Sequence, residues 1–213
     1  MPGYGTVYGC LLNYRSALAA LGDQVNAAPY QAPPRAPVLY IKPANTLSVS
    51  GAPIVLPPGV EALEVGPALG LVIGRTACRV AEAEAVDHLA GYALINDVTL
   101  PHASVYRPAI AQRCRDGFCP IGPVVAAAGI DPDRLTVRAL VNDVVGIEAS
   151  TAELIRPAAR LLAEVTAFMT LEPGDVLHVG VPHGAPLARA GDRVAIEIPG
   201  LGRLENHIVG GRA

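Results

Sequence analysis

Residues 91–123 read GYALINDVTLPHASVYRPAIAQRCRDGFCPIGP. The segment begins with the apolar run at residues 92–95, which predicts a buried strand that ends at Asn96-Asp97. The long polar stretch that follows contains His102, Arg107, Arg113, Arg115, Asp116 and two cysteines. Only 16% of the chain is charged, so this concentration is unusual. Loops that carry polar groups over an apolar scaffold are common places for binding and chemistry.

Length and composition limit the class of protein. With 213 residues, 51% of them hydrophobic, the chain is long enough to bury a substantial core. No apolar run approaches the roughly 18–20 residues of a membrane span, and the N-terminus does not read as a secretion signal. We therefore expect a cytoplasmic protein with no membrane partner. A net charge of −3 argues against a nucleic-acid partner.

Four cysteines, Cys10, Cys78, Cys114 and Cys119, are scattered along the chain. They contain no CxxC pair, so their spacing does not predict a zinc site. The chain is also large enough to fold without disulfides. We expect reduced thiols.

Hydrophobic patterning predicts many strands and few helices. After a short apolar entry at residues 7–12, strands are expected at residues 38–42, 69–73, 135–141, 144–149, 175–179, 193–198 and 204–209. Residues 47–50 and 53–56 predict a further strand pair across Gly51-Ala52, and Asn142-Asp143 predicts a tight hairpin turn. We interpret residues 1–213 as one domain that is mostly β with a few helices (α+β), with residues 1–45 as an N-terminal arm packed on it.

Three helices are expected. A short one is predicted at residues 17–21, and a longer one at residues 80–90, where Gly91 would be the C-terminal stop. A capping box at residues 150–153 predicts a third helix with an apolar face that extends to Phe168 and Met169. Pro157 should interrupt this helix, so that its main part begins near residue 157.

The polar residues of the opening segment have both ordinary and functional interpretations. Asp97 at a strand end is most often a turn former, although it would also suit a divalent cation. Arg107, Arg113 and Arg115 fit either a solvated loop or a site for an anionic substrate, because guanidinium groups bind carboxylates through two hydrogen bonds. His102 has a side chain suited to acid–base catalysis, but one histidine is weak evidence.

Two segments outside this loop also have a possible role in binding. Residues 180–184, GVPHG, follow a predicted strand and would either form a plain turn or bring His183 and backbone N–H groups to a ligand. Asn13-Tyr14 is too short to be specific by itself.

Together these segments resemble the fumarylacetoacetate hydrolase family along nearly the whole chain. The family landmarks are, in order, an NY segment, a KP segment, a VIG strand preceded by an ExE motif, a GYxxxND segment, a PIGP segment, a TLxPGD segment and a GTPxG turn. They correspond to Asn13-Tyr14, Lys42-Pro43, residues 72–74, residues 91–97, residues 120–123, residues 170–175 and residues 180–184. The resemblance implies the mixed β-roll or sandwich of that family's C-terminal domain.

Two further segments are similar to one branch of the family. LPxxSxYRPAI at residues 100–110 and CRDGFCPIG at residues 114–122 resemble the N-terminal half of the bifunctional isomerase/decarboxylases of 4-hydroxyphenylacetate degradation, in which two homologous halves are fused. The resemblance implies a subunit that acts on small di- and tricarboxylates. The reactions would be decarboxylation of 5-oxopent-3-ene-1,2,5-tricarboxylate and isomerisation of 2-hydroxyhepta-2,4-diene-1,7-dioate, both through an enolate.

The family also implies Mg²⁺ or Mn²⁺ held by three carboxylates, as a Lewis acid that stabilises the enolate. Asp97 matches one of them, but the two ExE glutamates fall at Gly66 and Ala68, which cannot bind a metal. Glu61 and Glu64 lie upstream and would need a local insertion to reach the site. A single carboxylate provides few of the oxygen ligands that a hard cation requires. We expect the metal to be weakly bound or absent in this chain alone.

Other departures concern the family's histidine, its lid lysine and the threonine of its turn. The histidine that follows NY falls at or near Ala17, the lysine falls near Arg113, and the threonine is Val181. The pocket is therefore expected to be kept in outline without its metal chemistry.

Two hypotheses follow. In the first, the chain is an enzyme subunit, a carbon–carbon lyase and isomerase. Its catalysis is metal-free or shared with a homologous subunit that carries ExE. The residues expected in this case are Arg113, Arg115 and His102 for catalysis, and Arg107, Asp116, Tyr14 and His183 for substrate binding. In the second, the chain is a non-catalytic structural subunit of that partner. Both imply an oligomer, either a homodimer or a complex of homologous subunits. A third hypothesis, an acylpyruvate-type hydrolase, is weakened by the loss of ExE and of the histidine.

Overall fold

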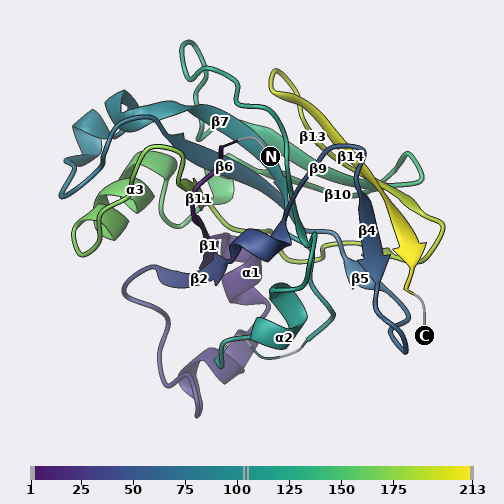
Figure 1. The fold of residues 1–213 in the computed structure, drawn as a ribbon. Coiled ribbons are helices and arrows are strands. Elements are labelled where there is room, and N and C mark those ends of the chain that lie inside the picture. The colour runs from purple at the N-terminus through teal and green to yellow at the C-terminus, as the bar shows by residue number, and fades with distance from the viewer. Residues whose placement is uncertain (1–2, 103, 105, 212–213) are drawn as a thin grey trace.

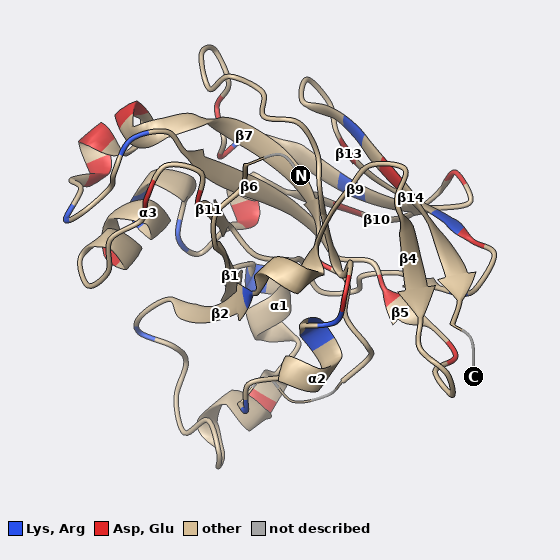
Figure 2. Ribbon diagram, in the orientation of Figure 1, with Lys and Arg blue, Asp and Glu red and all other residues tan. Residues whose placement is uncertain are grey.

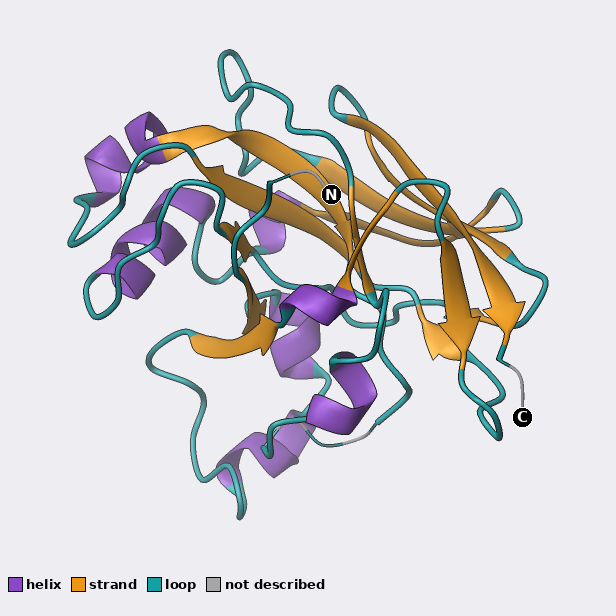
Figure 3. Cartoon of the chain, in the orientation of Figure 1, coloured by secondary structure: helices purple, strands orange, loops and turns teal. Residues whose placement is uncertain are grey.

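The computed structural model describes residues 3–102, 104 and 106–211, and strands dominate its secondary structure. The strands are β1 Val7–Leu11, β2 Val38–Lys42, β3 Leu47–Val49, β4 Pro53–Leu56, β5 Leu63–Glu64, β6 Pro67–Ile73, β7 Leu89–Asn96, β8 Cys119–Ile121, β9 Thr136–Val141, β10 Val144–Ser150, β11 Val176–His178, β12 Leu187–Ala188, β13 Arg193–Ile198 and β14 Gly202–Gly210. The helices are α1 Arg15–Ala19, α2 Ile110–Arg113 and α3 Ala158–Thr166, with 3₁₀ turns η1 Gly22–Asn26, η2 Ala44–Thr46, η3 Glu82–His88 and η4 Thr151–Glu153. The prediction of a mostly β fold with few helices is confirmed (Figure 3).

Two large sheets form the body of the protein (Figure 1). The seven-stranded sheet has the order β2-β1-β11-β6-β7-β8-β3, and the five-stranded sheet has the order β10-β9-β13-β14-β4. A two-stranded sheet, β12-β5, completes the set. Two strands of the predicted N-terminal arm, β1 and β2, belong to the large sheet, where β1 lies between β2 and β11.

The main core fills the space between the two large sheets. Leu69, Leu71 and Ile73 of β6 point into it, towards residues such as Ile196 and Leu204 of the five-stranded sheet. The alternate residues of β6 point to the opposite face of the seven-stranded sheet. All seven residues of β6 are buried, which explains the continuous apolar run in the sequence. Charged residues lie mainly in loops and at strand ends, and β6 and β7 contain none (Figure 2).

The opposite face of the seven-stranded sheet holds a second, smaller apolar cluster. It contains Val7, Ala68, Val72, Ala93, Ile95, Cys119, Ile121 and Val176. Asp97 follows β7 two residues after Ile95, so the alternation of a strand directs both side chains to this face. The polar site around Asp97 therefore lies beside this apolar cluster, on the same face of the seven-stranded sheet.

Two predicted turns have different outcomes. The hairpin at Asn142-Asp143 is confirmed, because β9 and β10 pair in antiparallel fashion and both turn residues have positive φ, 52° and 64°. The strand pair predicted across Gly51-Ala52 is wrong. β3 pairs with β8 in one sheet, and β4 pairs with β14 in the other, so this turn carries the chain between sheets.

The short helix predicted at residues 17–21 is found as α1 at Arg15–Ala19, and the other two predicted helices are shorter than the sequence pattern suggested. Within residues 80–90 the only helical structure is the 3₁₀ turn η3 at Glu82–His88; β7 begins at Leu89, so Gly91 lies inside a strand and not at a helix end. A glycine is needed there because a Cβ would lie 2.1 Å from the carbonyl oxygen of Val125. Pro157 precedes α3, as predicted, but Phe168 lies beyond that helix and is 67% exposed. Its predicted place on the apolar face is wrong.

Two smaller findings complete the description. No helix in the described part of the chain is long and apolar enough to cross a membrane. The four cysteines are free thiols, and burial raises the pKa of Cys10 and of Cys119 to about 12.

Candidate functional site

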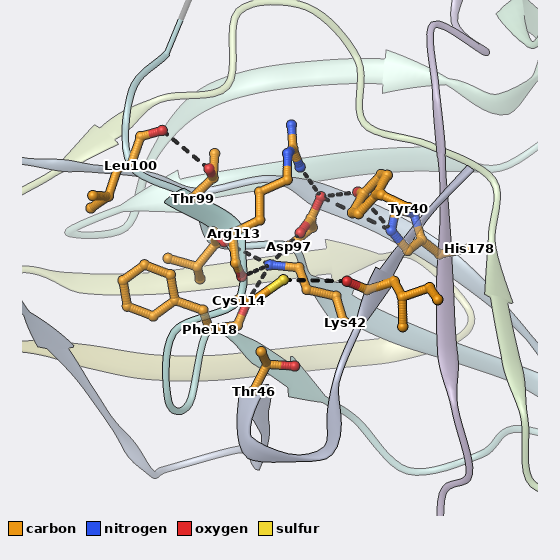
Figure 4. A network of polar contacts seen from close by, with 12 residues as sticks. Tyr40, Lys42, Thr46, Asp97, Thr99, Leu100, Arg113, Cys114, Phe118 and His178 are labelled. Carbon is orange, nitrogen blue, oxygen red and sulfur yellow. Dashed lines mark hydrogen bonds and ion pairs between the residues drawn. The ribbon is translucent and has the colours of Figure 1, made fainter. Parts of the chain in front are cut away.

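Asp97 is the centre of a buried polar network just beyond the end of β7 (Figure 4). Lys42 Nζ lies 2.7 Å from its Oδ1, and Arg113 Nη1 lies 2.9 Å from its Oδ2. The hydroxyl of Tyr40 also donates a hydrogen bond to Oδ2. Burial disfavours the charged carboxylate, but the charges of Lys42 and Arg113 outweigh it and hold the pKa of Asp97 well below its usual range.

Lys42, the only lysine in the chain, joins the network to the loop after β7. Its side chain is fully buried, and Nζ donates to the carbonyl oxygens of Val98 at 2.8 Å, Arg113 at 2.9 Å and Phe118 at 3.0 Å. Three N–H donors thus meet three carbonyls, with Asp97 as the counter-charge. The lysine therefore fixes the path of the loop that carries Arg113.

The network depends on a glycine in β1. Gly9 pairs with Tyr40 of β2 on one side and with His178 of β11 on the other. A Cβ at Gly9 would lie 2.3 Å from Tyr40 Cζ and 2.3 Å from His178 Nε2. Because Gly9 has no side chain, the two rings meet above it, edge to face, with their centroids 5.5 Å apart.

The hydrogen bonds run in one direction towards Asp97. The N–H of Gly180 donates to His178 Nδ1 at 3.3 Å, which leaves the proton of the neutral ring on Nε2. Nε2 lies 2.9 Å from the hydroxyl of Tyr40, whose own proton is directed to Asp97. Burial lowers the pKa of His178 to about 4. Burial and the charge of Asp97 raise the pKa of Tyr40 well above its usual value. Both groups are neutral near pH 7.

A cavity of about 380 Å³, the inner chamber, opens beside this network. Its polar lining consists of Tyr40, Glu64, Asp97, His102, Arg113 and His183. The guanidinium of Arg113 also stacks on the ring of Tyr40, with Cζ 4.6 Å from the ring centroid. Burial raises the pKa of Glu64, and the neighbouring His102 and Arg113 act against this shift. The chamber thus has a fixed cation at one wall and proton-carrying groups around it.

His102 lines the inner chamber, and one of its two ring nitrogens has no partner in the described part of the chain. Its Nδ1 lies 2.8 Å from the carbonyl oxygen of Leu100, so Nδ1 carries the proton that this hydrogen bond requires. Its Nε2 is buried and has no hydrogen-bond partner among residues 3–102, 104 and 106–211. Buried polar atoms are nearly always paired, so an unpaired one beside a cavity indicates a place for a ligand.

The structure brings together some of the residues predicted for the site. Asp97, His102, Arg113 and His183 line the inner chamber, and Arg107 lines an adjoining one.

The others lie outside both chambers. Tyr14 is fully buried, Arg115 Nε donates to the carbonyl of Ala111 at 2.8 Å, and Asp116 accepts a hydrogen bond from Asn45 at 2.7 Å. The geometry gives no support to a role for these three in binding or catalysis.

Sequence reasoning did not assign a function to Tyr40, Lys42, His178 or Glu64. Two signals were present in the sequence. Lys42 is the only lysine, and His178 interrupts an apolar strand. Tyr40 had no such signal, and Glu64 was considered only as a metal ligand that would need a local insertion. The place of both residues in the site depends on strand pairing between distant segments.

The residues at this site do not fit the divalent metal expected from the resemblance. At Gly66, a Cβ would lie 2.6 Å from the carbonyl oxygen of Asp97 and 3.1 Å from Val181. Ala68 is fully buried in the small apolar cluster. Both oxygens of Asp97 already contact cationic side chains. Within the described residues, no group of three or more His, Cys, Asp or Glu side chains is arranged to hold a metal ion.

Comparisons with protein families, curated proteins and solved structures agree with one another. Residues 6–209 match the model of the fumarylacetoacetate (FAA) hydrolase C-terminal family. The chain is 43% identical over 205 residues to the 4-hydroxyphenylacetate degradation bifunctional isomerase/decarboxylase of Escherichia coli, covering 96% of this chain and 47% of that protein. It thus spans about half the length of this curated relative.

Two solved structures have the same fold. The 2-hydroxyhepta-2,4-diene-1,7-dioate isomerase of Mycobacterium marinum is 29% identical with a TM-score of 0.81, over 99% of this chain and 76% of that one. The maleylpyruvate hydrolase of Sphingobium sp. SYK-6, in complex with manganese(II) and pyruvate, is also 29% identical with a TM-score of 0.81, over 100% of this chain and 73% of that one.

Proposed function

The chain belongs to the fumarylacetoacetate hydrolase family, and from that premise we propose that it is a subunit of an isomerase/decarboxylase that acts on small unsaturated di- and tricarboxylates. The relatives named above support this reaction class. The observation that carries the proposal is the position of His102, which lines the same cavity as Arg113 and whose buried Nε2 has no hydrogen-bond partner among the described residues.

These two residues supply what an enolate reaction needs. A histidine nitrogen with a free lone pair is a general base, and a fixed guanidinium stabilises negative charge on a carboxylate or an enolate oxygen. In the isomerisation, His102 Nε2 takes the hydroxyl proton of the dienol, the negative charge spreads over the conjugated chain, and a proton is returned to carbon. One proton moves, and no oxidant or reductant is required.

The network around Asp97 serves this step by holding Arg113 in place. Arg113 contacts Asp97 through Nη1 and the ring of Tyr40 through its face, so its guanidinium has little freedom to move. Preorganised charge of this kind lowers a barrier without reorganisation during the reaction. His183 and Glu64 line the same chamber and would contact the substrate.

A second candidate function is a non-catalytic subunit that supports a homologous chain with an intact ExE motif. The observation that favours it is the lack of space and of ligands at Gly66 and Ala68. Under this proposal the enolate chemistry takes place in the partner.

One experiment separates the two functions. The chain alone, the chain with His102→Gln, and each of them mixed with a homologue that carries ExE are assayed for isomerisation and decarboxylation, with and without Mn²⁺. Turnover by the chain alone that His102→Gln abolishes supports the first function. Turnover that appears only in the mixture and does not respond to His102→Gln supports the second.

A further inference from the structure

A second cavity, the outer chamber, adjoins the inner one. Its volume is about 330 Å³, and it shares Leu11, Tyr40, His102 and Arg113 with the inner chamber. Its remaining lining is almost entirely apolar and comes from β2 and from the loop leading into α2 (Val38, Leu39, Ile41, Tyr106, Pro108 and Ile110). The His102 and Arg113 side chains thus stand at the boundary between a polar and an apolar compartment.

The outer chamber gathers apolar side chains that are open to solvent. Ile41 is 49% exposed, Tyr106 is 55% exposed and Ile110 is 62% exposed. Single exposed apolar residues are ordinary, but several around one cavity indicate a surface that an apolar group covers. The occupant therefore has an apolar section next to a group that suits the guanidinium of Arg113.

Arg107 supplies the remaining chemistry of the outer chamber. Its side chain is exposed, lines this cavity, and forms no hydrogen bond or ion pair with the described part of the chain. The chamber thus has one cation at its inner wall, Arg113, and a second, unpaired one among its apolar side chains. This arrangement suits a linear molecule with a negative charge at each end.

We propose that the outer chamber is a specificity-determining subsite that selects a linear dicarboxylate with an apolar middle section. One carboxylate lies at Arg113, the carbon chain covers Leu39, Ile41 and Ile110, and the second carboxylate is bound by Arg107. The inference rests on the proposed function, because it takes the inner wall as the place of the substrate's first carboxylate. It adds a length requirement and assigns each arginine to one end of the ligand.

Calorimetric titration of the whole chain tests the subsite. The probes are heptanedioate, butanedioate and the monocarboxylate heptanoate. Heptanedioate has three more methylenes than butanedioate, and their partial burial predicts about tenfold tighter binding. Arg107→Ala should weaken the binding of heptanedioate by about threefold to tenfold, because a charge-assisted contact is lost. It should leave the affinity for heptanoate unchanged.

Two further variants complete the design. Ile110→Asn should weaken the binding of both seven-carbon ligands, heptanedioate and heptanoate, and should leave the affinity for butanedioate unchanged. Arg75→Ala removes an exposed arginine that lines neither chamber, and should leave all three ligands unchanged. Both Arg107 and Ile110 are exposed, so their replacement should leave the melting temperature close to that of the wild type.

Each contrary outcome has a definite meaning. Equal affinities for heptanedioate and butanedioate, or an Arg107→Ala effect that is the same for heptanedioate and heptanoate, would overturn the subsite but not the proposed function. Failure of all three ligands to bind would overturn both. If the three ligands bind with the predicted affinities but the activity assay shows no turnover, the subsite is supported and the catalytic role of the chain is contradicted.

Discussion

Asp97→Asn is the substitution that most clearly distinguishes a charge-compensated carboxylate from one that waits for a metal. Asn keeps the shape of the side chain and removes its charge. In the wild type, Asp97 contacts Lys42 Nζ at 2.7 Å and Arg113 Nη1 at 2.9 Å, and the Lys42 and Asp97 side chains are fully buried. Without the carboxylate, two cations remain close together with no counter-charge between them.

The structure sets the expected size of the effect. Removing one partner of a buried ion pair costs about 3–5 kcal/mol, because the other charge is left uncompensated. Lys42 keeps its hydrogen bonds to the carbonyl oxygens of Val98, Arg113 and Phe118, which lessens the loss. We therefore expect the free energy of unfolding to fall by about 3 kcal/mol, at the lower end of that range.

Urea unfolding followed by circular dichroism measures this change. With a urea dependence of about 2–3 kcal/mol per molar, the midpoint should fall by about 1 M or more. Asp116→Asn is the matched control, since Asp116 lies in the same loop and accepts its hydrogen bond from Asn45 in an exposed setting. This control should change stability by less than about 0.5 kcal/mol.

A double substitution strengthens the test. Adding Lys42→Met to Asp97→Asn removes a buried charge together with its partner. The double variant should therefore lose less free energy of unfolding than the sum of the losses of the two single variants. An unchanged or increased stability of Asp97→Asn alone would contradict this expectation. It would mean that the carboxylate is a burden on the fold, as expected for a metal ligand without its metal.

Three further predictions concern the groups around Asp97. Burial holds the pKa of His178 near 4, below its usual 6.5, so between these values the unfolded chain binds a proton that the folded chain does not. The free energy of unfolding should therefore fall as the pH is lowered from about 6.5 to about 4, by up to ~3 kcal/mol, and His178→Gln should remove this dependence in urea unfolding at several pH values. Gly9→Ala, whose Cβ would lie 2.3 Å from Tyr40 Cζ, should lower the melting temperature through a loss of about 2 kcal/mol or more, whereas Gly3→Ala, with open space around its Cβ, should not. His102→Gln should lower kcat of any isomerisation by the chain alone by about 100-fold or more with an unchanged melting temperature; a fall in melting temperature with unchanged kcat would give His102 a structural role.

Local sequence patterns predicted most of the strands, but they said much less about which strands pair with one another in the sheets. The apolar run of β6 and the two-residue turn at Asn142-Asp143 were recognisable because period and turn chemistry are local properties. Residues 47–56 were assigned to one hairpin, yet β3 and β4 belong to different sheets. Alternation of apolar residues shows which face of a strand is buried, but it does not identify the neighbouring strand.

The same limit explains what the sequence showed of the site. Asp97, His102 and Arg113 were predicted because they lie in one loop, and the structure brings them to one cavity. Tyr40 and His178 come from β2 and β11, strands that are separated in the sheet only by β1. Their meeting over Gly9 depends on strand register, which no local pattern in these segments reveals.

In the function proposed here, the pocket binds its carboxylate ligand with its own cationic side chains and does not require a divalent metal. The most direct test is calorimetric titration of heptanedioate into the chain in the presence of EDTA, and again with EDTA replaced by Mn²⁺. We expect the same dissociation constant for heptanedioate in both solutions. Binding that is absent in EDTA and restored by Mn²⁺ would contradict it.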